Sequence, residues 1–143
     1  MGLPYIKRPP EEAVQVLDDC IVSGYEVKDK INEEYFNDRT SVDGEKVTKW
    51  HKMSTDWAND CLNKLGNVFV SKKELYEFRD APVSGLVRRG NMEWNNIINV
   101  HEARVKRLTE YDRFIRQEFT INIEVVGRDK ITNSGDGKVE IKN

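Results

Sequence analysis

The feature that most constrains the fold is a change of pattern near the end of the chain. Up to about residue 119, apolar side chains recur every three or four positions, as on one face of an α-helix. From residue 121 onward apolar residues alternate with polar ones, which is typical of an extended strand. A shorter alternation follows a turn rich in glycine and asparagine. The alternating apolar residues are Ile121, Ile123, Val125, Val139 and Ile141.

This pattern predicts a mainly α-helical body with a short C-terminal β hairpin or arm. Residues 1–119 form the predicted bundle of four to five helices, and residues 120–143 form the predicted arm. A two-stranded hairpin on its own is only marginally stable in water. We therefore expect the arm either to fold back on its own bundle or to pair with the arms of other copies.

Start and stop signals divide the helical body into five segments. Pro10 and the two glutamates after it mark the start of the first helix, and Gly24 is a plausible stop. Ser71 and Glu74 match a capping box, and Val70 is placed to form part of a hydrophobic staple. The predicted helices cover residues 10–24, 27–36, 45–65, 71–78 and 91–119.

The last predicted helix is too long to be covered by the short ones. At the usual rise per residue it spans about 40 Å. Its apolar stripe reaches Ile115 and Phe119, next to the predicted arm, so both features place a site of association at the same end. The predicted oligomerisation residues are Ile115, Phe119, Ile121, Ile123, Val125, Val139 and Ile141.

The charge balance argues against a dedicated nucleic-acid binder. The formal net charge is −2, so no global positive field attracts phosphate backbones. Trp50, Trp57 and Trp94 all fall on helix seams and are interpreted as core anchors rather than as a platform for stacking bases. No apolar run is long enough to span a bilayer. Two cysteines within helical patterns favour a reducing compartment, so a cytoplasmic protein without a membrane partner is expected.

The residues that commonly carry chemistry do not form a recognisable catalytic or metal motif. Cys20, Cys61, His51 and His101 lack the spacing of a zinc site, and no metal or cofactor is expected. A Cys61–His101 nucleophile pair is conceivable on facing helices, but burial raises the pKa of a thiol and disfavours it. His101 is interpreted as a hydrogen-bonded core or interface residue. No catalytic residue is assigned.

One loop has the composition of a weak anion site. Residues 85–90 contain two glycines and two arginines, but they lack the Gly-Lys-Ser/Thr end of a phosphate-binding loop. The loop leads into the N-terminus of the longest helix, where backbone N–H groups attract negative charge. The alternative is a solvated loop whose arginines pair with surface carboxylates. The candidate ligand-binding residues are Arg88, Arg89, Gly90 and Asn91.

Two stretches resemble parts of bacterial defence and signalling proteins. The spacing of Trp57, Leu62, Leu65 and Phe69, followed by residues 74–78, resembles helical modules that precede effector domains. The run Val-Gly-Arg-Asp-Lys-Ile-Thr-Asn at 126–133 resembles segments that connect or follow such modules in bacterial conflict proteins. The nucleotide-hydrolysing and nuclease domains of those systems have no counterpart in this chain. The resemblance therefore implies an accessory or assembly part.

These observations favour a non-enzymatic, self-assembling interaction protein. The resemblance places it as an accessory module of a bacterial or phage-borne conflict system, acting as a homo-oligomer with a possible further protein partner. A small ligand- or nucleotide-sensing domain is the alternative, and an enzyme of unknown type is the third hypothesis.

Overall fold

The computed structural model describes residues 5–125, with side chains described as far as residue 118. The chain divides into two compact units, residues 1–113 and 114–143, and the packing reported below belongs to the first. The elements in chain order are α1 (Pro10–Asn37), the short 3-10 helix η1 (Arg39–Ser41), α2 (Gly44–Leu65), α3 (Lys73–Arg79) and α4 (Met92–Val125).

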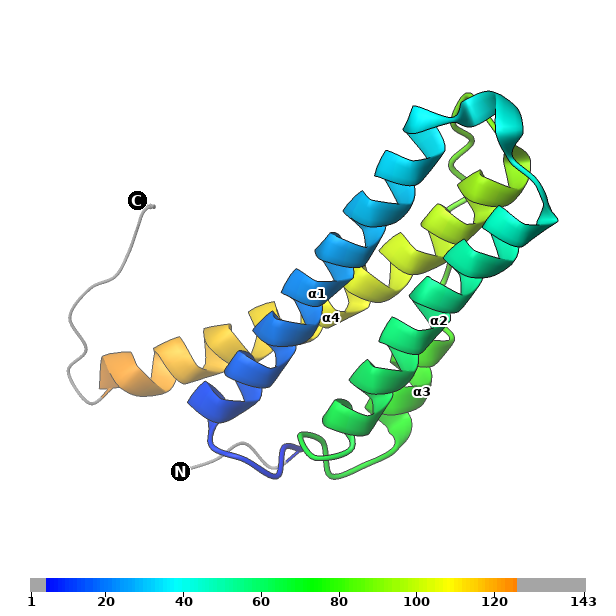
Figure 1. Cartoon of the computed structure of the whole chain (residues 1–143). Coiled ribbons are helices and arrows are strands. Elements are labelled where there is room, and N and C mark those ends of the chain that lie inside the picture. The colour runs from blue at the N-terminus through cyan, green and yellow to red at the C-terminus, as the bar shows by residue number, and fades with distance from the viewer. Residues whose placement is uncertain (1–4, 126–143) are drawn as a thin grey trace. The chain divides into compact units, whose positions relative to one another are not determined.

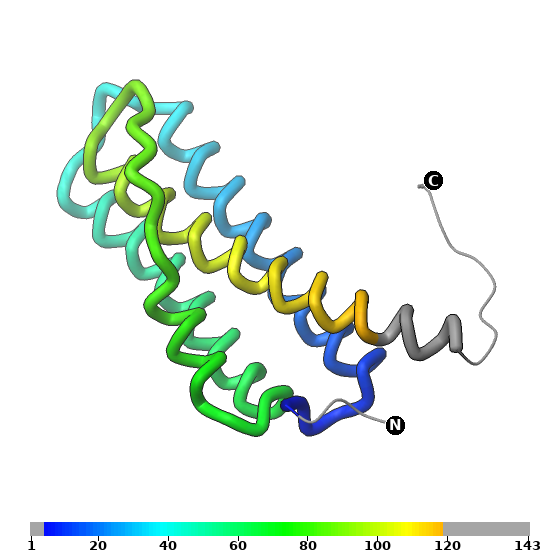
Figure 2. Tube along the Cα trace, turned by 180° about the vertical axis from the view of Figure 1, so that it is seen from behind, coloured from blue at the N-terminus to red at the C-terminus, as the bar shows by residue number. Residues whose placement is uncertain are grey.

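The helices form a bundle, as the periodicity predicted. Helices α1 and α2 and the first part of α4 run side by side (Figure 1). From the opposite side, the segment between α3 and α4 is seen returning along the bundle to the start of α4 (Figure 2). The described part of the chain is therefore mainly α-helical, with four packed helices. None of these helices is both long enough and apolar enough to cross a membrane.

The predicted stop at Gly24 is wrong, because α1 continues through it and absorbs the separate helix predicted at 27–36. Gly24 is buried and serves close packing instead of termination. A Cβ atom at this position would lie 2.7 Å from Cζ2 of Trp57 and 2.9 Å from Cγ2 of Val105. Since glycine costs a helix interior only about 1 kcal/mol relative to alanine, close packing against α2 and α4 outweighs the local preference.

The three tryptophans are core residues, as expected from their seam positions. All three are buried, with no more than 5% of any side chain exposed. Each indole N–H also has an acceptor, which removes the cost of burying an unpaired donor. The three bonds, each 3.0 Å long, run from Trp50 to Oε1 of Glu34, from Trp57 to the carbonyl of Cys20, and from Trp94 to Oδ1 of Asn32.

An aromatic cluster joins the C-terminal end of α1 to the starts of α2 and α4. The Tyr35 ring stacks on Trp94 with centroids 4.1 Å apart and meets Trp50 edge-on at 6.1 Å. Aromatic pairs in these arrangements add to the stabilisation from burial alone. The buried cluster comprises Ile31, Tyr35, Trp50, Trp94, Ile97 and Ile98.

The start of α3 differs in detail from the predicted capping box. The helix begins at Lys73, and the hydroxyl of Ser71 accepts a hydrogen bond from the backbone N–H of Lys73 at 2.9 Å. Val70 is exposed, so it does not form the predicted staple. Its backbone N–H instead bonds the carbonyl of Tyr5 at 3.0 Å, next to an antiparallel bridge between Ile6 and Phe69. Within residues 5–125, this bridge is the only β pairing.

Residues 120–125 of the predicted β arm are helical. Helix α4 extends to Val125, so the strand predicted to begin at residue 121 is wrong as far as residue 125. Extending an existing helix costs little even for β-branched residues, whereas a strand needs a pairing partner that residues 5–125 do not provide. Ile115 is buried, and its role in oligomerisation stays a prediction. The Phe119 side chain and residues 126–143, including Val139 and Ile141, lie outside the described part.

Candidate functional site

Arg88, the first of the predicted ligand-binding residues, is engaged by side chains of α4. Its guanidinium donates hydrogen bonds to Oδ1 of Asn95 at 3.2 Å, to Oδ1 of Asn99 and to Oε1 of Glu102. Only 22% of the Arg88 side chain is exposed. Its positive charge is therefore paired within the chain, which weakens the case for Arg88 as a direct ligand of an anion.

Gly90 and Asn91 form the N-terminal boundary of α4. Gly90 has φ of 131°, and a Cβ there would lie 2.2 Å from the hydroxyl oxygen of Tyr35. That same hydroxyl accepts a hydrogen bond from the Asn91 backbone N–H at 2.8 Å, and Oδ1 of Asn91 accepts from the Trp94 N–H at 3.0 Å. The donors expected to hold an anion are thus partly occupied by the protein itself. Arg89 is exposed, and anion binding by this loop stays a prediction.

Two buried asparagines of α4 hold the segment between α3 and α4 against the bundle. The Nδ2 groups of Asn95 and Asn99 donate to the Leu86 carbonyl at 3.2 and 2.7 Å. Nearer α3, the guanidinium of Arg104 donates twice to the carbonyl of Arg79, at 3.0 and 3.2 Å. Because buried backbone polar groups need partners, these bonds fix the path of a segment that has no secondary structure of its own.

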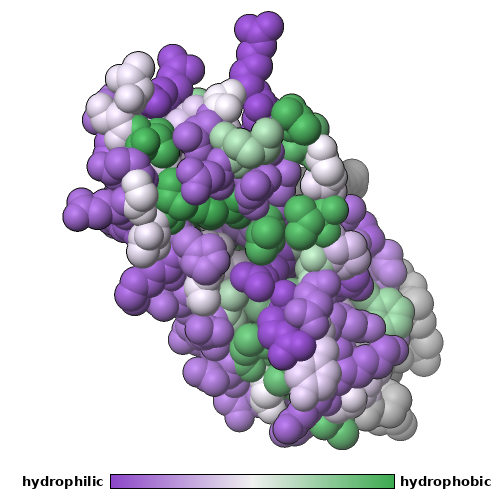
Figure 3. Space-filling view, turned by 90° about the vertical axis from the view of Figure 1, so that its right-hand side faces the viewer, coloured by the Kyte–Doolittle hydropathy of each residue, from purple (hydrophilic) through white to green (hydrophobic). Residues whose placement is uncertain are grey.

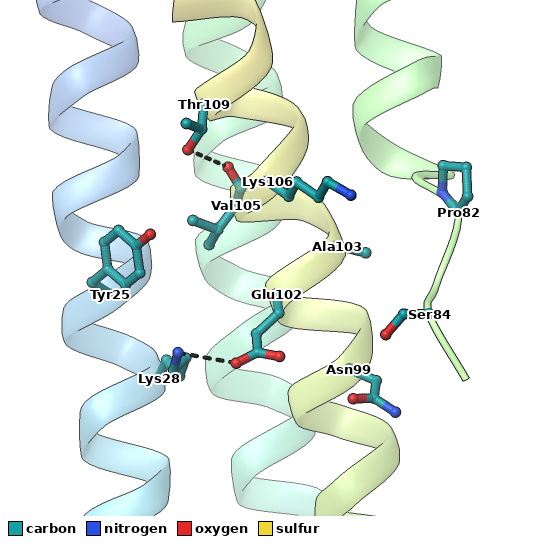
Figure 4. Close-up of a pocket in the computed structure, with 10 residues that line it drawn as sticks. All are labelled: Tyr25, Lys28, Pro82, Ser84, Asn99, Glu102, Ala103, Val105, Lys106 and Thr109. Atoms are coloured by element: carbon teal, nitrogen blue, oxygen red, sulfur yellow. Dashed lines mark hydrogen bonds and ion pairs between the residues drawn. The ribbon is translucent and has the colours of Figure 1, made fainter. Parts of the chain in front are cut away.

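The fixed segment closes one side of a groove of about 400 Å³ along the surface of α4. Figure 4 shows Tyr25 and Lys28 projecting from α1 on one side, with Pro82 and Ser84 on the other. Each residue contributed by α4 lies three or four positions from at least one other in the set, as expected for one helix face. They are Asn99, Glu102, Ala103, Val105, Lys106 and Thr109.

Some of the charged residues at this groove form ion pairs and one does not. Glu102 bridges two cations, with its Oε2 atom 3.0 Å from Nζ of Lys28 and its Oε1 atom bonded by Arg88. Lys106 makes no ion pair or side-chain hydrogen bond with any other described residue. Figure 4 shows the Lys106 side chain extending away from Glu102 toward Pro82. The groove lining therefore holds two cations, Lys28 and Lys106, and the single carboxylate of Glu102.

A serine and a histidine meet inside the bundle in a geometry that resembles a nucleophile and its base. Oγ of Ser54 lies 2.8 Å from Nδ1 of His101, and the Trp57 ring packs on the imidazole with centroids 4.5 Å apart. Burial lowers the pKa of His101. Because Ser54 is 4% exposed and His101 is fully buried, a substrate has no access to the pair in this conformation. This geometry supports the structural role expected for His101.

The two cysteines are also buried and lie against each other between α1 and α2. A hydrogen bond links the two thiols, and together with burial it raises the pKa of the Cys61 thiol above its usual range. Reactive cysteines need partial exposure and a positive environment that stabilises the thiolate. Neither condition holds for Cys61. The thiol is therefore not paired with His101, whose ring bonds Ser54 and Gly24 instead.

Among residues 5–118, no three side chains of His, Cys, Asp or Glu come together as a possible metal site. Comparison with known proteins finds no matching family, curated protein or solved structure. The chemistry of the chain's own residues therefore carries the functional interpretation.

The sequence did not single out the residues that form the groove. Lys28 and Glu102 are 74 positions apart, so no local pattern links them. One signal was present, because Asn95 and Asn99 are polar residues four apart and directly follow the apolar seam positions Trp94 and Ile98. Such a pair indicates that something polar, here the backbone of another segment, packs on that face.

Proposed function

We propose that the protein is a non-enzymatic interaction module that associates with a second copy of itself through the surface around residues 83–93. The observation that supports this proposal is a group of exposed apolar side chains close together in the chain. Val83, Leu86, Val87 and Met92 are 48%, 55%, 74% and 61% exposed. Figure 3 shows several exposed hydrophobic residues grouped among hydrophilic ones on one face of the molecule.

Hydrogen bonds to the backbone order this surface before any partner binds. Bonds from Asn95 and Asn99 to the Leu86 carbonyl, and from the Arg88 N–H to Asn95, fix the backbone beneath the exposed side chains. A surface that is already ordered loses less conformational entropy when it meets a partner. Removing these side chains from water supplies the driving force.

The charges that flank the apolar residues favour a second copy as the partner. Arg89 and Glu93 are both exposed, and neither makes an ion pair within the described residues. In a two-fold interface, residue i of one copy meets residue j of the other, and the reverse contact forms as well. Arg89 of each copy can then face Glu93 of the other, which makes the surface complementary to itself.

A charge-swap series with molar mass measured by light scattering tests the proposal. At tens of micromolar the parent protein should be dimeric, and Arg89→Glu or Glu93→Arg alone should shift it toward monomer through like-charge repulsion. The combined Arg89→Glu/Glu93→Arg variant should restore the dimer. A monomeric parent protein, or single variants that dimerise as well as the parent, would rule out this surface.

A second pair of variants tests whether association depends on the apolar residues of this surface or on exposed apolar residues in general. Leu86→Ser/Val87→Ser should abolish association, since both side chains lie at the centre of the proposed interface. Val22→Ser/Val70→Ser also removes two exposed apolar residues, but away from this surface, and should leave the molar mass unchanged. Equal loss of association in both double variants would contradict the proposal.

The biological setting of the proposed module rests on sequence alone. The resemblance of residues 126–133 to segments of bacterial conflict proteins supports an accessory role in a bacterial or phage-borne conflict system. The genes that neighbour the coding sequence test this role. An adjacent effector gene is expected, and neighbours confined to housekeeping metabolism would argue against it.

A further inference from the structure

We propose that the groove between α1, α4 and residues 82–84 binds a small organic anion, one that joins a phosphate or carboxylate group to an apolar or aromatic body. This inference is independent of self-association, because it rests on different residues. It also moves the anion site predicted at Arg88–Asn91 to Lys28 and Lys106.

The local charge sets the sign of the ligand. Among the residues that line the groove, Lys28 and Lys106 carry positive charges and Glu102 carries a negative one, so the lining holds an excess of one positive charge. Both carboxylate oxygens of Glu102 are already paired with cations. A bound anion therefore meets little repulsion from Glu102, and it gains an attraction that is strengthened by partial exclusion of water.

The two lysines differ in how many of their N–H donors are already used within the protein. Lys28 is held in place, with Nζ 3.0 Å from Oε2 of Glu102 and 5.6 Å from the centroid of the Tyr25 ring. An ammonium group has three donors, so Lys28 retains donors for a ligand after bonding Glu102. Lys106 has all three donors available within the described structure. Figure 4 shows the Lys28 ammonium on the α1 side of α4 and the Lys106 side chain extending toward Pro82. Lys106 therefore supplies the charge-assisted bond to a phosphate or carboxylate group, and Lys28 adds positive charge on the α1 side.

The remaining walls favour an organic body over a bare inorganic ion. Tyr25 presents its ring to the groove, and Pro82, Ala103 and Val105 add apolar surface (Figure 4). The groove volume of about 400 Å³ falls within the usual range of small-molecule sites. Ala103 leaves room in the floor that a larger side chain would occupy.

Two simple compounds test both halves of the inference on the full-length protein. Phenyl phosphate and benzoate combine an aromatic ring with a phosphate and a carboxylate, whereas inorganic phosphate and phenol carry only one feature each. Titrations followed by amide chemical shifts should show saturable changes at residues 82–84 and 102–106 with phenyl phosphate or benzoate, in the range of about 1 mM. Inorganic phosphate and phenol should bind at least several-fold more weakly.

Variants then separate the groove from the rest of the surface. Lys106→Met should weaken binding about tenfold through loss of a charge-assisted contact, and Lys106→Arg should retain most of the affinity. Lys30→Met removes an equal charge from an exposed position on α1 outside the groove and should have no effect. Ala103→Phe should block the floor and abolish binding while leaving every charge in place.

Two outcomes would overturn the proposal. One is the absence of saturable shifts with both aromatic anions at up to about 10 mM, in a sample whose spectrum shows a folded protein. Another is binding by Lys106→Met and Ala103→Phe that matches the parent. Tighter binding of phenyl phosphate would identify the ligand as an organic phosphate, and tighter binding of benzoate would identify it as a carboxylate.

Discussion

Nε2 of His101 lies 2.7 Å from the backbone carbonyl oxygen of Gly24, deep between α4 and α1. A carbonyl oxygen can only accept a hydrogen bond, so Nε2 must carry the proton in the neutral ring. Nδ1 is then an acceptor, and the hydroxyl of Ser54 donates to it across 2.8 Å. Both ring nitrogens are thus used in joining three helices, which accounts for a polar side chain at a fully buried position.

This arrangement predicts that stability falls in mildly acidic solution. Burial is the largest effect and lowers the pKa of His101 below its ordinary value of 6.5, and the hydrogen bond to Gly24 is the next largest and opposes it. The charges of Arg104 and Lys28 lower this pKa further, and the charge of Glu102 raises it slightly. The unfolded chain therefore binds a proton before the folded chain does. Since stability rises with pH wherever the unfolded state holds more protons, the free energy of unfolding should decrease as the pH falls below 6.5.

Chemical denaturation between pH 5 and 8 measures this effect against a matched variant. His101→Gln cannot titrate in this range, although it keeps a polar side chain that can bond Gly24 or Ser54. The variant should be less stable than the parent at neutral pH, and its stability should depend less on pH below 6.5. Parallel pH profiles for the two proteins would show that His101 does not contribute.

A second prediction concerns the close approach of three helices at Gly24. Gly24→Ala places a methyl group 2.7 Å from the Trp57 ring and 2.9 Å from a methyl group of Val105, and both neighbours are buried. Overpacking typically costs about 1–3 kcal/mol, which exceeds the gain of about 1 kcal/mol from replacing a helical glycine. We expect a net loss of up to about 2 kcal/mol in the free energy of unfolding, measured by urea denaturation.

Gly44→Ala is the control for this substitution. An added Cβ at Gly44 meets nothing within 4 Å, so the change should alter stability by no more than about 0.5 kcal/mol. If Gly24→Ala proves as stable as Gly44→Ala, the contact between α1 and Trp57 is looser than the structure describes.

The helical body could be predicted because it depends on local periodicity. The seam positions of Trp50, Trp57 and Trp94 identified them as core residues from spacing alone. The errors arose where a distant contact outweighed a local preference. Gly24 looked like a stop because glycine ends many helices, and nothing near it in sequence shows that Trp57 packs on it.

The candidate site was harder to predict from the sequence, because it also depends on contacts between distant positions. Arg88 was recognised as a potential ligand residue, but the groups that engage it, Asn95, Asn99 and Glu102, lie on the next helix and are positioned by the fold. The groove residue Lys28 comes from the first helix and meets Glu102 of the last. Contacts between such distant positions depend on how the helices are ordered in the bundle, which periodicity does not specify.

A third prediction is that both thiols are inert in the folded protein. Cys20 and Cys61 are both fully buried, so a bulky reagent has no access to either thiol in the folded protein. Labelling by a bulky thiol reagent should therefore be slow, and its rate should rise to that of a free thiol only in denaturant. Rapid labelling of the native protein would contradict this prediction.

Alanine at either cysteine position tests the packing role of the thiols. Cys20→Ala or Cys61→Ala should lower the free energy of unfolding by about 1 kcal/mol and leave association unchanged. The loss should show in denaturant unfolding. A molar mass that changes with either substitution would instead indicate a role in assembly.

The final prediction separates two adjacent arginines that look equivalent in the sequence. Arg88 is partly buried and bonds Asn95, Asn99 and Glu102, whereas Arg89 is exposed. Arg88→Ala removes several bonds at once and leaves two buried asparagines with fewer partners, so it should cost about 1–3 kcal/mol. Arg89→Ala should change the free energy of unfolding by less than about 0.5 kcal/mol.

Hydrogen exchange locates the effect of Arg88→Ala and distinguishes it from general destabilisation. Because the Arg88 side chain helps to fix the segment between α3 and α4, its loss should raise amide exchange near the Arg88 position and the start of α4 before it affects the centre of α2. The Leu86 carbonyl keeps its bonds from Asn95 and Asn99, so the segment should loosen without detaching. Uniform acceleration across all helices would mean that Arg88 stabilises the whole bundle rather than this segment.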